Sequence, residues 1–107
     1  MSGSRFRNGK FMPLISFIVL GVLDRDDMKI TEIKRIVDRC MDESLHYSHL
    51  QRILDVLVAR RYIGFRYIYK GSKKIRQYYL TDKGRNFYRD IIDKLTMLEA
   101  IVDDCLY

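Results

Sequence analysis

Residues 62–81 read Tyr62-Ile-Gly-Phe-Arg-Tyr-Ile-Tyr-Lys-Gly-Ser-Lys-Lys-Ile-Arg-Gln-Tyr-Tyr-Leu-Thr81, and they contain two β-prone runs on either side of a short basic turn. Runs rich in aromatic and β-branched residues, separated by a turn that contains glycine, are typical of a β-hairpin. The turn, residues 70–74, carries three lysines. Cationic side chains on an exposed tip beside a helix suit contact with phosphate groups.

The segment before the hairpin has the periodicity of an amphipathic helix that begins near His46 or Tyr47. Four apolar residues recur at i, i+3, i+4 and i+7, namely Leu50, Ile53, Leu54 and Leu57. This spacing places them on one buried face. The opposite face carries polar side chains, namely Tyr47, Ser48, Gln51, Arg52 and Asp55, with His49 on its flank.

Three further elements are expected upstream. An apolar run predicts a central buried helix over residues 11–23, with Pro13 in its first turn. Residues 28–30 are a predicted short strand, and Thr31 is the predicted N-cap of a second helix. The buried face expected for that helix consists of Ile33, Ile36, Val37, Cys40 and Met41.

The segment after the hairpin predicts one long helix, from Thr81 or Asp82 to about Cys105. Its apolar residues are spaced 3, 4, 3, 4 and 3 apart, which is the a/d pattern of a helix–helix seam. The seam consists of Tyr88, Ile91, Leu95, Leu98, Val102 and Cys105. Because a helix of this length extends beyond the core of a small domain, the excess apolar face predicts a homodimer. Packing of the seam against the first helix is the alternative.

The charge of the chain is unevenly distributed. The 107 residues form one expected domain with a formal net charge of +6. Residues 60–89 hold ten Lys or Arg and a single acid, whereas residues 90–107 hold five acids and one Lys. A basic face suits nucleic acid, although the same charge attracts anionic membranes and acidic partners.

The cysteines and the apolar run indicate a cytoplasmic protein without a membrane partner. Cys40 and Cys105 match no zinc-binding spacing. The run over residues 11–23 is too short to span a bilayer, and acidic residues follow it in place of a signal-peptide cleavage site. We therefore expect an intracellular chain with reduced thiols, and a flexible N-terminal tail over residues 1–10.

Three segments together resemble winged helix-turn-helix transcription regulators: Leu45-His-Tyr-Ser-His-Leu-Gln-Arg-Ile-Leu-Asp-Val-Leu57, Tyr62-Ile63 and Tyr78-Tyr-Leu-Thr-Asp-Lys-Gly84. The resemblance covers most of residues 11–90 and is strongest to PadR- and MarR-type proteins, including small versions from archaea and their viruses. It implies an α+β, mostly helical fold with a DNA-binding core over residues 11–81 and a dimerisation helix over residues 82–107. Two departures are that Arg61 stands where the family usually has glycine, and that PadR proteins generally carry a longer C-terminal region.

In such proteins the helix before the hairpin enters the major groove, and the hairpin tip, or wing, meets the phosphate backbone. Gln forms hydrogen bonds with the edge of adenine and Arg with the edge of guanine, whereas Ser does not discriminate between bases. The residues expected to bind DNA are Tyr47, Ser48, His49, Gln51 and Arg52 on the helix, and Lys70, Lys73, Lys74 and Arg76 on the wing. The simpler explanations are a solvated helix face and lysines that protect the edge of a hairpin.

The predicted function is therefore a homodimeric regulator of transcription that binds specific double-stranded DNA, with two recognition helices about 34 Å apart, one DNA turn. No cofactor is expected. The alternatives are a winged helix that docks a partner protein, and an architectural or single-strand binder in which tyrosines stack on bases.

Enzymatic and metal-binding functions are not favoured by the sequence. The chain contains no phosphate-cradling glycine loop, no GxSxG and no HExxH motif, so it is not predicted to be an enzyme. A metal site built from Cys40, Asp42, His46 and His49 is conceivable. It is disfavoured because Cys40 is expected in a buried stripe.

Overall fold

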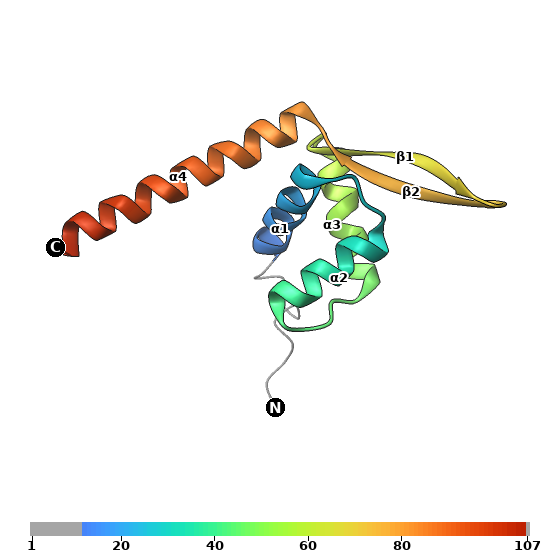
Figure 1. Cartoon of the computed structure of the whole chain (residues 1–107), viewed down its shortest axis with the longest axis horizontal. Coiled ribbons are helices and arrows are strands. Elements are labelled where there is room, and N and C mark those ends of the chain that lie inside the picture. Colours follow the sequence, from blue (N-terminus) through green and yellow to red (C-terminus); the bar gives the residue numbers. More distant parts are fainter. Residues whose placement is uncertain (1–11, 107) are drawn as a thin grey trace.

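The computed structural model describes residues 12–106, which form four helices and one two-stranded antiparallel sheet. The elements are α1 (Met12–Arg25), α2 (Ile30–Met41), α3 (Tyr47–Ala59), β1 (Ile63–Lys70), β2 (Lys73–Leu80) and α4 (Asp82–Leu106). Figure 1 shows α1, α2 and α3 gathered into one body, from which the hairpin and α4 extend in opposite directions. The predicted tail over residues 1–10 lies outside the described residues.

The hydrophobic core lies between the three N-terminal helices and the base of the hairpin. The four residues predicted for the buried face of α3 are all buried, namely Leu50, Ile53, Leu54 and Leu57. The hairpin contributes Ile63, Tyr78 and Leu80 to the same cluster. Burial of each large apolar side chain stabilises the fold by about 1.5–3 kcal/mol, so the helical body depends on these contacts.

The hairpin has a two-residue turn, and its register runs from Ile63 opposite Leu80 to Lys70 opposite Lys73. Gly71 has a φ of 63°, the sign required at the first central position of a type II′ turn. This type of turn matches the twist of the strands, so β1 and β2 remain paired without interruption up to Lys70 and Lys73 at the tip of the wing.

Two predictions about the start of α2 are wrong. Residues 28–30 do not form a strand; Met28 makes a single antiparallel bridge to Tyr78, with backbone bonds of 3.0 and 2.8 Å. The N-cap is Lys29, not Thr31. The carboxylate of Glu32 accepts a hydrogen bond from the backbone N–H of Lys29 at 3.1 Å, which satisfies a helix-terminal donor and starts α2 at Ile30.

The predicted burial of Cys40 is also wrong. The inward face of α2 consists of Ile33, Val37 and Met41, four residues apart, while Ile36 is half-buried and Cys40 is exposed. Cys40 follows Ile36 on the flank of this face, away from the core that its neighbour Met41 enters.

The junction from β2 to α4 is hydrogen-bonded to the segment that follows α3. The hydroxyl of Thr81 accepts a hydrogen bond from the N–H of Gly84 at 3.0 Å, which caps the first turn of α4. The single hydrogen of the same hydroxyl is shared between two carbonyl oxygens, that of Arg61 at 2.7 Å and that of Tyr62 at 2.9 Å. Arg61 has a φ of 65°, a left-handed conformation that explains why glycine is expected there.

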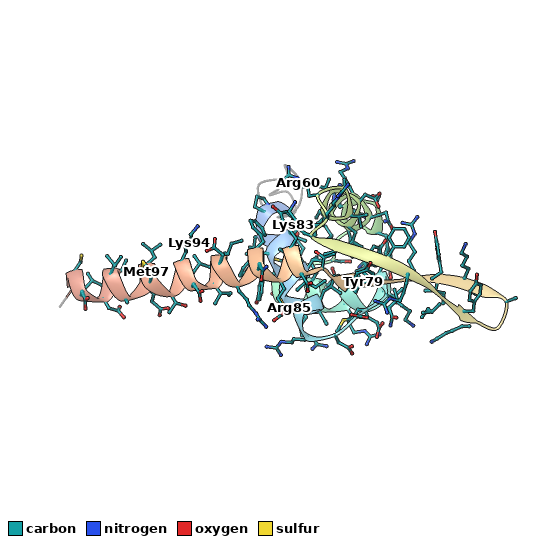
Figure 2. All side chains as sticks on the ribbon, turned by 90° about the horizontal axis from the view of Figure 1, so that it is seen from above. Arg60, Tyr79, Lys83, Arg85, Lys94 and Met97 are labelled. Atoms are coloured by element: carbon teal, nitrogen blue, oxygen red, sulfur yellow. The ribbon has the colours of Figure 1, made fainter. Side chains whose placement is uncertain are left out.

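The first turns of α4 pack on the body, and the rest extends away from it. Arg85 pairs with Asp24 of α1 at 3.3 Å, and Tyr88 packs on Phe17 with ring centroids 5.0 Å apart. Beyond these contacts every residue from 92 to 106 is exposed. Figure 2 shows Lys94 and Met97 on this free part of the helix. No described helix is long and apolar enough to cross a membrane.

Candidate nucleic-acid interface

The polar residues predicted on α3 do lie on the side of the helix away from the core. Tyr47, Ser48 and Arg52 are exposed, and His49 is half-buried. The ring of Tyr47 lies 5.1 Å from the ammonium group of Lys34, which holds it against α2. The N-terminal half of α3 therefore presents polar and aromatic groups to solvent.

Gln51 connects this face of α3 to the wing. Its Nε2 atom donates to Oδ1 of Asp55 at 2.9 Å and to the hydroxyl of Tyr78 at 3.1 Å. Tyr78 is only 1% exposed, so its hydroxyl is a fixed point at the base of the hairpin. The position of α3 relative to the wing is thus set by packing and by a direct polar contact.

The register of the hairpin divides the predicted wing cations between two faces. Side chains of a strand alternate between the faces of the sheet. The face that includes Tyr78, here called the α3-side face, also carries Lys74 and Arg76. The opposite face, here called the outer face, carries Lys70 and Lys73. The four cations therefore do not form one cluster.

On the α3-side face, cations stack on aromatic rings. Lys74 lies 3.9 Å from the ring centroid of Tyr67, and Arg76 lies 4.3 Å from that of Phe65. Hydrogen bonds from Arg76 to the hydroxyls of Tyr78 and Tyr67 raise the pKa of the guanidinium, so it stays charged. These contacts hold both cations in place and reduce the entropy lost on binding an anion.

On the outer face, two cations join the predicted ones. Arg66 lies 4.7 Å from the ring centroid of Tyr79 and 3.9 Å from a carboxylate oxygen of Asp27. Lys29 lies close enough to Lys70 for their contact and charge repulsion to lower the pKa of Lys70. Strand alternation in the sequence signals that Arg66 shares a face with Lys70, whereas Lys29 reaches it only through the fold.

The predicted seam on α4 has two parts. Tyr88 is half-buried and packs against the chain's own core, where its ring contacts Phe17 and its hydroxyl fills the space beside Gly21. Ile91 lines an apolar groove of about 360 Å³ between α1, α3 and α4. The remaining seam residues are exposed, namely Leu95, Leu98, Val102 and Cys105.

The four residues considered as metal ligands are not gathered into one site. Within residues 12–106, no group of three or more His, Cys, Asp or Glu side chains is arranged to hold a metal ion. His46 and His49 make an edge contact with ring centroids 5.8 Å apart. Asp42 is the left-handed C-cap of α2, so its backbone role explains its position in the turn.

Comparison with known proteins relates this geometry to a fold. No family model matches the sequence. No curated protein matches it either. Solved structures do match. A PadR-like transcriptional regulator from Bacillus cereus is 13% identical, with a TM-score of 0.75 over 90% of this chain and 94% of that one.

Two further structures come from the PadR family itself. A PadR family transcription regulator from Clostridium difficile is 18% identical, with a TM-score of 0.72 over 87% of this chain and 98% of that one. Bacillus subtilis PadR in complex with operator DNA is 23% identical, with a TM-score of 0.66 over 74% of this chain and 46% of that one. The chain therefore has the winged helix-turn-helix fold of PadR-like regulators, in which the β1–β2 hairpin is the wing and α3 is the helix that precedes it.

Proposed function

We propose that the protein is a transcription regulator that binds specific double-stranded DNA as a homodimer. The exposed face of α3 would enter the major groove, and the wing would contact the phosphate backbone. No catalytic role is proposed. The shared fold supports this function, because one protein with that fold was solved with operator DNA.

The observation that carries the proposal is the continuous surface from α3 to the wing. Gln51 and Tyr78 join the two elements, and Arg76 and Lys74 extend the surface along the α3-side face. A polar helix face beside a row of cations combines groups that reach base edges with groups that bind phosphates. The residues proposed to bind DNA are Tyr47, Ser48, His49, Gln51, Arg52, Lys70, Lys73, Lys74 and Arg76.

The homodimer is supported by the apolar surface of α4. Leu95 is 50% exposed, Leu98 is 56% exposed and Ile101 is 51% exposed, so a monomer would leave this stripe in water. The groove between α1, α3 and α4 adjoins the stripe, with Phe87 and Ile91 in its lining. A second copy that covers the stripe would hold two recognition helices in one body and strengthen binding to a two-part site.

Two measurements test the proposal. Binding to a random duplex should weaken steeply as salt rises, because the wing and α3 would displace condensed cations from DNA. A footprint on the promoter region of the protein's own gene should then show a protected site with two-fold symmetry. Absence of duplex binding at low salt would favour a winged helix that docks a protein, and uniform protection would favour an architectural binder.

A further inference from the structure

The side chain of Gln51 is held in an orientation that leaves only its oxygen available. An amide nitrogen carries two hydrogens. In Gln51 these two hydrogens serve the bonds to Asp55 at 2.9 Å and to Tyr78 at 3.1 Å. Among residues 12–106, no side chain or backbone group donates to the Oε1 atom of Gln51. The half-buried side chain therefore offers an acceptor and no donor.

The chemistry of Asp55 determines which end of the amide faces inward. The nitrogen and oxygen of an amide are similar in shape, and their neighbours decide the assignment. A carboxylate only accepts hydrogen bonds, so the NH2 group must face Asp55. Turning the amide over would place its oxygen against the carboxylate oxygen.

Tyr78 supports the same orientation from the wing. Its hydroxyl oxygen accepts the hydrogen bond from Nε2 of Gln51 at 3.1 Å, and the residue is only 1% exposed, so it cannot turn away from Gln51 without disturbing the core. Gln51 is thus fixed by a helix neighbour on one side and by a rigid strand residue on the other.

We propose that Gln51 is a specificity-determining residue that presents a single acceptor to the exocyclic amino group of adenine or cytosine. This inference rests on the proposed function. A free Gln reads adenine with two bonds, one to N6 and one to N7. Because both amide hydrogens of Gln51 are already used, N7 receives no bond from it. The residue would read an amino group and ignore the rest of the base.

Base analogues test this directly. Binding sequences are first selected from random duplexes, and the base pair read by Gln51 is the one whose preference disappears in Gln51→Ala. At that pair, an analogue that lacks the amino group, purine for adenine or 2-pyrimidinone for cytosine, should weaken wild-type binding roughly two- to tenfold. A 7-deaza analogue of the purine in the same pair should leave binding unchanged.

A variant in which the amide of Gln51 has lost its two internal hydrogen-bond acceptors completes the experiment. Asp55→Ala combined with Tyr78→Phe removes both internal acceptors while it keeps the ring in the core. Its binding should become sensitive to the 7-deaza analogue at an adenine, because the freed amide can then reach N7. Asp55→Ala alone, at an exposed position, serves if the double variant fails to fold.

The outcomes are distinct. Wild-type binding that falls with the 7-deaza analogue, or a folded variant that stays insensitive to it at an adenine, would overturn the acceptor assignment. A Gln51→Ala variant with an unchanged sequence preference would overturn the role of Gln51 altogether. Failure of the wild-type protein to bind any duplex would instead overturn the proposed function.

Discussion

The α-carbon of Gly84 lies against the carbonyl oxygen of Tyr62, so close that an added Cβ would stand 1.9 Å from that oxygen. The contact joins the first turn of α4 to the start of the wing. Two further residues hold this junction in place. Thr81 bonds to the carbonyl oxygens of the segment after α3, and Lys83 donates to the carbonyl oxygen of Arg60 at 3.0 Å. The contacts of residues 80–84, Leu-Thr-Asp-Lys-Gly, thus fix the direction in which α4 leaves the body.

Replacement of Gly84 by Ala should destabilise the fold by about 1–3 kcal/mol or more, because the Cβ meets backbone that cannot easily move. The melting temperature should fall by about 4–8 °C for each kcal/mol. Asn86→Ala, at an exposed position two residues later in α4, is the matched control and should change it little. Equal melting temperatures for the two variants would show that the junction relaxes at low cost.

Replacement of Lys73 and Lys74 by Ala removes one cation from each face of the wing. Affinity should fall about equally for every duplex, since phosphates carry no sequence information. The slope of log K against log salt should flatten by about one unit for each lost contact. Lys94→Ala, on the free part of α4, is the control. Unchanged affinity and slope in the double variant would mean that the wing does not bind phosphates.

Arg52 is exposed on α3 and is suited to a guanine edge. Arg52→Ala should reduce specific binding by about 1–3 kcal/mol and relax the preference at one base pair. Titration of the selected duplex and of a random duplex measures both effects. If the two duplexes lose affinity equally, Arg52 contacts only the backbone.

Leu98→Glu would place a carboxylate in the centre of the proposed dimer interface, where an unpaired charge is costly to bury. Analytical ultracentrifugation should detect a monomer, and DNA binding should weaken because two half-sites are no longer held by one body. Thr96→Glu adds the same charge on the other side of α4 and should leave the dimer intact. A wild-type protein that sediments as a monomer would refute the dimer.

Cys105 is exposed in the seam near the end of α4. If the two helices pair symmetrically there, mild oxidation should produce an interchain disulfide, provided the Cα atoms approach within about 7 Å. Non-reducing gels should show a dimer band for the wild type and none for Cys105→Ser. Absence of the band in the wild type would exclude a close symmetric approach of the two thiols.

Features that depend on local pattern were predictable from the sequence. The buried face of α3 follows from the spacing of Leu50 and Leu54, and the hairpin follows from the two β-prone runs on either side of Gly71. The turn itself is shorter than the predicted residues 70–74, because the strands pair as far as Lys70 and Lys73. The predictions failed where neighbours outside the element decide. Cys40 has an apolar side chain, yet it lies on the flank of α2 and is exposed, while its neighbour Met41 is buried in the core.

The candidate site was predicted as a set of residues but not as an arrangement. Nothing in the local sequence joins Gln51 to Tyr78, because they are 27 residues apart and meet only when the hairpin packs on α3. The separation of Lys70 from Lys74 depends on strand register, which a one-residue shift would reverse. Residue type indicates the chemistry that each side chain can perform, whereas tertiary contacts determine which of its atoms remain free to bind.

The exposed half of α4 has a consequence for how the amount of protein in the cell would affect its action. Residues 92–106 are all exposed, and most of the stability of a helix in a protein comes from packing of its apolar face, so this half of α4 is weakly stabilised in a single chain. Folding of this segment and association of two chains would therefore be one coupled equilibrium that depends on concentration. Occupancy of a two-part DNA site would then rise more steeply with protein concentration than binding by a monomer would. Below a certain concentration, newly made protein would therefore occupy the site only rarely.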